Sequence, residues 1–143
     1  MKKIYLLLIA LMISSMAIAA VSAGTDMETK DFDGKFTIDV PKGATFEDNS
    51  DGAGKIFFSQ DIGITIVYFV DPKINSTSIN DIYQEIANQS DYTIQGTEGN
   101  VTTLTSNGGD GCIMSVYKDG IYVTVSGTDK ELIKSMIDTV KFK

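Results

Sequence analysis

The residues best suited to chemistry form a short acidic stretch at positions 47–52 of the chain. Oxygen-bearing side chains (Glu47, Asn49 and Asp51) fall at positions 1, 3 and 5, and a glycine falls at position 6, as in a calcium-binding loop. Position 9 is Lys55, whose ammonium group would repel a cation, and position 12 lacks the bidentate glutamate. Two interpretations remain: a metal or small-ligand site, or a solvated turn between strands. The turn is favoured, so we expect no bound metal and no cofactor.

A second stretch, residues 107–111, is rich in glycine but lacks the Lys-Ser/Thr that completes a phosphate-binding loop. We interpret it as a connection between strands. Cys112 follows it, and the chain has one Cys and no His. Its thiol has no partner for an internal disulfide and no imidazole to deprotonate it, which favours a small buried hydrophobe. The alternative is an external thiol that pairs between chains.

The remaining residues do not support a catalytic function. The absence of His removes the commonest general base, no Gly-x-Ser-x-Gly turn is present, and the acidic residues are scattered through turns and strands. We therefore expect a protein that is not an enzyme. Three sequons, at Asn75, Asn88 and Asn100, lie at expected loops or helix ends and are candidate glycosylation sites.

The charge of the chain limits its partners. Its 12 basic residues are all lysine, its acidic residues number 19, and the net charge is −7. Nucleic-acid binding requires clustered cations that displace counterions, so this class of partner is excluded.

The first 23 residues have the three parts of a secretory signal peptide. Lys2 and Lys3 precede an apolar run over residues 4–21. The run is followed by small residues up to Ala23, immediately before Gly24. We expect export and cleavage between Ala23 and Gly24. The alternative is an uncleaved anchor, because residues 4–21 are just long enough to cross a bilayer. Either way the domain lies outside the cytoplasmic membrane, and it contacts the membrane only through residues 4–21 if they are retained.

The chain after the signal reads as a flexible lead-in at 24–31 and one α+β domain at 32–143. Period-2 alternation or apolar runs bounded by turns predict strands over residues 36–40, 55–59, 62–70, 92–97, 101–106, 112–117, 121–126 and 140–142. Residues 62–70 are apolar on both faces, which predicts a central strand.

Helical spacing of apolar residues predicts helices at Ser78–Asn88 and Asp129–Asp138. Ser78 is the expected N-cap of the first, and Thr128 with Glu131 forms the expected capping box of the second. Tight turns between consecutive strands predict one antiparallel sheet of about six to eight strands with both helices packed on it. The expected core is Phe36, Ile38, Val40, Phe57, Ile64, Ile66, Tyr68, Ile82, Ile86, Val116, Val123, Met136 and Ile137.

Residues 32–43 (Phe-Asp-Gly-Lys-Phe-Thr-Ile-Asp-Val-Pro-Lys-Gly) resemble the opening of PsbP-like proteins, the family of a photosystem II extrinsic subunit. The ending is similar too, with a capped helix at Asp129–Asp138 that runs into a strand ending at Phe142. The resemblance implies an antiparallel sheet with helices on its faces and an accessory or binding role outside the cytoplasm. Many members carry a Trp soon after Pro-x-Gly, where this chain has Ala44-Thr45-Phe46, and no residue of known activity can be carried over.

Together these features favour a non-enzymatic domain that binds an unknown protein partner at the cell envelope. The alternative is a small-ligand or Ca²⁺-binding module that uses the acidic loop 47–52. An accessory domain would expose an apolar patch on a sheet face, whereas a ligand-binding module needs a cavity of roughly 300–1,000 Å³ with convergent polar groups.

Overall fold

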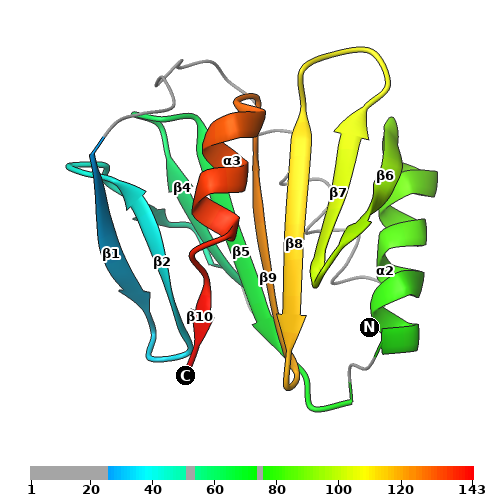
Figure 1. The fold of residues 1–143 in the computed structure, drawn as a ribbon, viewed down its shortest axis with the longest axis horizontal. Helices are drawn as coiled ribbons and strands as arrows, with labels where there is room; N and C mark the ends of the chain where they lie inside the picture. The colour runs from blue at the N-terminus through cyan, green and yellow to red at the C-terminus, as the bar shows by residue number, and fades with distance from the viewer. Residues whose placement is uncertain (1–25, 51–53, 74–75) are drawn as a thin grey trace.

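The fold is α+β, as expected, with two helices and two antiparallel sheets (Figure 1). A computed structural model describes residues 26–50, 54–73 and 76–143, and the structure is discussed for these residues only. The expected signal peptide and its cleavage position at Ala23 and Gly24 lie outside this range, as do Asp51 and Asn75.

The larger sheet has seven antiparallel strands in the order β3-β4-β5-β9-β8-β7-β6. The strands are β3 (Glu47–Asp48), β4 (Lys55–Ser59), β5 (Ile64–Val70), β6 (Tyr92–Glu98), β7 (Val101–Ser106), β8 (Cys112–Lys118) and β9 (Ile121–Gly127). Strand β5 lies between β4 and β9 and is buried on both faces from Ile64 to Phe69. This confirms the interior strand that the two apolar faces of residues 62–70 predicted.

A separate three-stranded sheet corrects the expectation of a single sheet. It consists of β1 (Met27–Phe32), β2 (Phe36–Pro41) and β10 (Lys141–Phe142), with β2 in the middle. The interpretation of residues 24–31 as a flexible lead-in is therefore wrong for the part that forms β1. That strand lies at a sheet edge and fully buries only Phe32, so its sequence is mostly polar and lacks the usual strand pattern.

Tight turns connect β1 to β2 and β8 to β9. Asp33 and Gly34 adopt φ values of 55° and 68° between β1 and β2, and Asp119 and Gly120 adopt 50° and 81° between β8 and β9. Two consecutive positive φ values suit the right-handed twist of the paired strands, which explains the Asp-Gly pair in the three-residue β1–β2 loop and in the two-residue β8–β9 loop.

The two helices are α2 (Ser76–Gln89) and α3 (Lys130–Ile137). Ser78, the expected N-cap of the first helix, lies inside α2 instead. The N-cap of α3 is Asp129, not Thr128, because the Asp129 carboxylate accepts a hydrogen bond from the Leu132 amide. No helix in the described part of the chain is long and apolar enough to cross a membrane.

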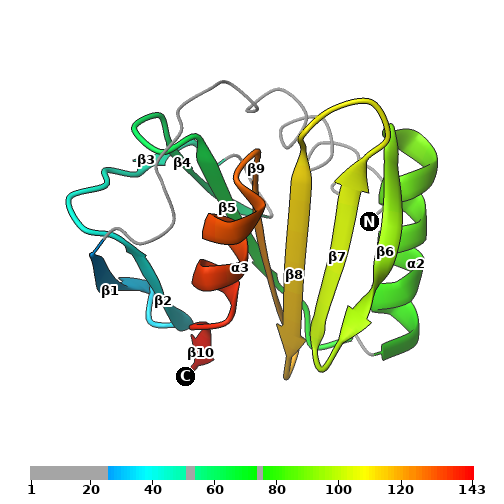
Figure 2. The ribbon, with the colours of Figure 1, turned by 45° about the horizontal axis from the view of Figure 1, so that its top comes forward.

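The helices cover opposite faces of the seven-stranded sheet (Figures 1 and 2). The small sheet and α3 pack on one face and enclose the first core cluster, which includes Phe36, Ile66 and Met136. Helix α2 packs on the other face and encloses the second core cluster, which includes Ile82 and Tyr122. All the expected core residues are buried except Phe57, which is half-buried because β4 has only the two-residue strand β3 beyond it.

Candidate functional site

The described part of the acidic loop is organised as a turn. The Asp48 carboxylate accepts a hydrogen bond of 2.9 Å from the Ser50 amide. The Ser50 side chain, together with this amide, holds the pKa of Asp48 below its usual value. Glu47 and Asn49 are exposed, and the Asn49 amide donates to the Ile56 carbonyl. Asp51, the third candidate ligand, lies outside the described residues, and no three acidic, His or Cys side chains elsewhere in the described range gather as a metal site would require.

The glycine-rich stretch 107–111 connects β7 to β8, as expected. Asn107 holds it in place, because its side-chain amide donates to the Asp91 carboxylate over 3.0 Å. Cys112 is only 1% exposed, and burial raises the pKa of its thiol. The thiol is therefore a buried hydrophobe, as the sequence predicted, and not an external group. Among the sequons, Asn88 is exposed near the end of α2 and Asn100 is exposed in the β6–β7 turn.

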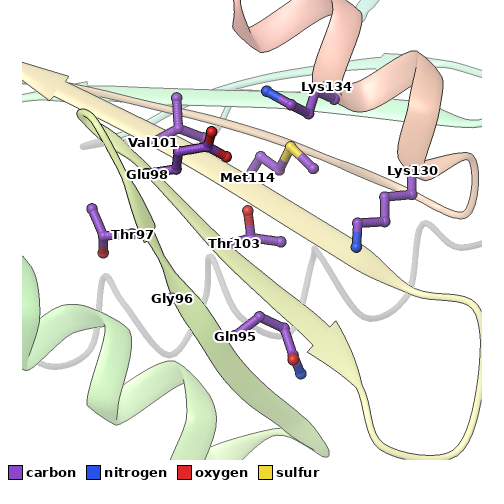
Figure 3. A pocket seen from close by; sticks show the side chains of 9 residues that line it. All are labelled: Gln95, Gly96, Thr97, Glu98, Val101, Thr103, Met114, Lys130 and Lys134. Carbon is purple, nitrogen blue, oxygen red and sulfur yellow. The ribbon is translucent and has the colours of Figure 1, made fainter.

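A groove between α3 and the uncovered part of the large sheet gathers polar groups from distant parts of the sequence (Figure 3). It has a volume of about 390 Å³, within the usual range for ligand pockets. Its lining residues are Gln95, Gly96, Thr97, Glu98, Val101, Thr103, Met114, Lys130 and Lys134. None of them was a candidate from the sequence, because they come from β6, β7, β8 and α3.

A β-bulge in β6 gives the groove two of its polar side chains. The register of β6 against β7 shifts between Ile94 and Gly96. The backbone φ of Gly96 is 148°, a value that residues other than glycine rarely adopt. In a regular strand Gln95 and Glu98 would point to opposite faces, since they are three positions apart. The extra residue in the bulge allows both to line the groove.

The charges of the groove are separated along its length. Lys134 forms an ion pair of 2.9 Å with Asp138, one turn further along α3, which raises the pKa of Lys134. Lys130 and Glu98 form no ion pair with any residue in the described ranges. The groove thus presents the Lys130 ammonium group, which is in no ion pair, and the Glu98 carboxylate, which lies near Lys134 without a contact within ion-pair distance.

Neutral groups occupy the space between these charges. The Gln95 side-chain amide donates to the Thr105 hydroxyl over 2.6 Å, which fixes the orientation of the amide. Thr103 and Val101 are half-buried, and Met114 is buried below them. Amine, carboxylate, amide and hydroxyl groups of this kind bind a polar ligand through hydrogen bonds and charge.

A second set of polar groups lies under α2 and is buried apart from Thr97 at its edge. The groups form a row of hydroxyls, called here the hydroxyl row, that crosses the sheet. Its members are Thr124, Ser115, Thr102 and Thr97, and the hydroxyls of Tyr122 and Tyr83 join it. Ser115 shares hydrogen bonds of 3.0 Å with Thr124 and 3.1 Å with Tyr122, and Thr102 shares one of 3.0 Å with Thr97. The Tyr83 hydroxyl of α2 bonds to Thr102 and Ser115 and so joins the two halves. Burial raises the pKa of Tyr83 far above its usual value, so the row is neutral and suited to structure.

A scan against protein-family models and a search of curated proteins found no match to this chain.

Proposed function

We propose that the chain is an exported, non-enzymatic domain that binds a partner at the cell envelope, with the groove between α3 and β6–β8 as its binding site. The observation that carries this proposal is the convergence of Lys130, Glu98, Gln95 and Thr103 on one open cavity of about 390 Å³. Residues from four elements converge there, and the β6 bulge is what allows both Gln95 and Glu98 to face it.

The export half of the proposal rests on the sequence. Lys2 and Lys3, the apolar run 4–21 and the small residues before Gly24 favour a secreted or extracytoplasmic protein, which is cleaved after Ala23 or anchored by the retained segment. The PsbP-like opening and ending of the domain support an accessory role. The acidic charge and the absence of arginine argue against nucleic acid as the partner.

The groove is a better binding site than the acidic loop. Of the three candidate ligands, the described residues include Glu47 and Asn49, both exposed in or beside an edge strand. An apolar docking patch is disfavoured, because Val70, at 46% exposure, is the one exposed large hydrophobic residue in the described part of the chain. By the criterion given under Sequence analysis, the missing patch and the polar cavity favour a ligand-binding groove over an apolar docking face.

Photocrosslinking tests this proposal in the organism that makes the chain. A photoreactive amino acid is placed at Gln95 in the groove, or at Gln84, which is exposed on α2 across the sheet. We expect a reproducible adduct from the Gln95 position that the Gln84 position does not give, and that the combined Lys130→Met and Glu98→Gln substitutions abolish. Equal adducts from both positions, or none from Gln95, would refute the groove as the binding site.

N-terminal sequencing of the same exported protein tests the location. A start at Gly24 is expected, whereas a start at Met1 in the membrane fraction would show that the segment is retained.

A further inference from the structure

We infer that the groove recognises a short zwitterionic peptide of two to four residues, with its ammonium group at Glu98 and its carboxylate at Lys130. This inference rests on the proposed function and names the chemistry that the same site takes.

Strand register and the close-up view in Figure 3 place the two charges toward opposite ends of the groove. Glu98 is paired with Val101, at the start of β7. At the other end Thr105 is paired with Cys112 and accepts a hydrogen bond from Gln95. The Lys130 ammonium acts electrostatically on the Cys112 thiol, and Glu98 acts on Lys134. Figure 3 agrees, with Glu98 on the side of Lys134 and with Gln95 and Lys130 toward the other end.

The backbone lengths of the elements that border the groove set the range of ligand lengths. Lys130 and Lys134 are four positions apart on α3, an axial distance of about 6 Å. Val101 and Thr105 are four positions apart on β7, a distance of about 13 Å. An extended peptide advances about 3.3–3.6 Å per residue, so two to four residues bridge this interval. The charges of a free amino acid are too close together to reach both groups.

The groups between the charges suit a peptide backbone. Thr103 offers a hydroxyl that can donate and accept, and Gln95 keeps its carbonyl oxygen free because its nitrogen is the atom that bonds Thr105. Val101 and Met114 supply an apolar floor, and a methionine adapts to side chains of different shape. We therefore expect selection by the two terminal charges and tolerance of the side chains between them.

Lys134 does not compete for the peptide carboxylate. Its ammonium group is held by both oxygens of Asp138, at 2.9 and 3.2 Å, so its charge is already compensated. The net charge of −7 does not exclude a ligand with a carboxylate, because this ligand carries both signs.

A peptide series titrated into the purified, isotope-labelled protein tests the inference by NMR. Trialanine is the probe, and its affinity is compared with those of N-acetyl-trialanine, trialanine amide and free alanine. For a ligand of this size in an open groove we expect a Kd of about 0.1–1 mM, with shifts at Gln95, Thr103 and Lys130. Blocking either terminus should weaken binding about three- to tenfold.

Matched variants show which charged residue of the protein binds which end of the peptide. Glu98→Gln should remove the effect of N-acetylation and keep that of amidation, and Lys130→Met should do the reverse. Lys118→Met, an exposed lysine in the β8–β9 hairpin, should behave as the parent protein. Equal sensitivity to both blocking groups in every variant, or shifts that map away from the groove, would overturn the inference.

Adding trialanine to the crosslinking experiment separates this inference from the proposed function. If trialanine suppresses the Gln95 adduct, the partner carries the same pair of charges. If trialanine binds and no protein adduct forms, a free peptide is the ligand. This result supports the inference and refutes the proposed protein partner. If an adduct persists at high trialanine and no shifts appear, the inference is wrong and the proposed function stands. If there is neither binding nor adduct, both are refuted.

Discussion

Removing the Tyr83 hydroxyl should weaken the attachment of α2 to the sheet without disturbing its packing. Tyr83 is 4% exposed, and its ring lies 6.0 Å from the Tyr122 ring. Tyr83→Phe keeps this aromatic contact and deletes the hydrogen bonds to Thr102 and Ser115. Both partners keep another bond, since Thr102 remains bonded to Thr97 and Ser115 to Thr124. No buried hydroxyl is stranded, so the cost should be the net value of two hydrogen bonds, about 1–2 kcal/mol.

Ser115→Ala should cost more, because Ser115 is the hub of the hydroxyl row. It removes bonds to Tyr83, Tyr122 and Thr124, and it leaves the Thr124 hydroxyl buried without the Ser115 partner that holds it. The lost hydrogen bonds, together with the penalty for leaving the buried Thr124 hydroxyl without this partner, should lower the free energy of unfolding by about 2–4 kcal/mol. In the double variant the shared bond is lost only once, so the total should fall short of the sum by about 0.5–1.5 kcal/mol.

Urea unfolding of the purified variants measures these differences. Tyr83→Phe should lower the midpoint by about 0.5–1 M, given the slopes usual for small proteins. Ser135→Ala is the matched control, because Ser135 is an exposed serine whose hydroxyl bonds only to the Leu132 carbonyl of its own helix. It should change stability by less than about 0.5 kcal/mol. Full additivity of Tyr83→Phe and Ser115→Ala would refute the argument that one connected row joins α2 to the sheet.

Three further outcomes follow from the packing, the tyrosines and the acidic loop. Gly127→Ala should cost about 1–3 kcal/mol in urea unfolding, because its Cβ would lie 2.7 Å from the Gly63 carbonyl oxygen, whereas Gly109→Ala has room and should be near neutral. Burial raises the pKa of Tyr92 to about 12, so its contribution to stability should be complete below about pH 10 and lost between pH 10 and 12, as alkaline unfolding curves would show. Addition of Ca²⁺ should leave the Tm unchanged, and a rise in Tm that Asp51→Ala removes would restore the calcium interpretation.

Local patterns in the sequence predicted six of the seven strands of the large sheet, all except the two-residue β3. Residues 62–70 indicated an interior strand because both faces had to be apolar. Asp119 and Gly120 lie between two expected strands and suit a hairpin, because few other residues accept positive φ. The division into two sheets was not predictable in this way. Strand β1 is polar, and the pairing of β2 with β10 joins segments about 100 residues apart, for which the local pattern carries no signal.

The groove was missed for the same reason. Lys130 and Lys134 read as the solvated face of a helix, and Thr103 reads as the outer face of a strand. Their meeting depends on where α3 crosses the sheet, which is a tertiary property. One local signal was present, since Gly96 inside a strand pattern indicates a bulge or a close approach. The acidic loop has the composition of a metal-binding loop, although in the described part of the chain its residues form the hydrogen bonds of a turn.

The arrangement of the small sheet has a consequence for the order in which the molecule folds. Strand β2 lies between β1 and β10, and the Asp39 amide donates to the Thr139 hydroxyl across 100 residues of chain. The second core cluster, by contrast, uses only residues 56–122. Closing a long loop costs entropy before its contacts contribute, so domains rich in such contacts fold slowly, on the order of milliseconds to seconds. We therefore expect the α2 side to form first, while the first core cluster stays open until residues 130–142 dock and close it.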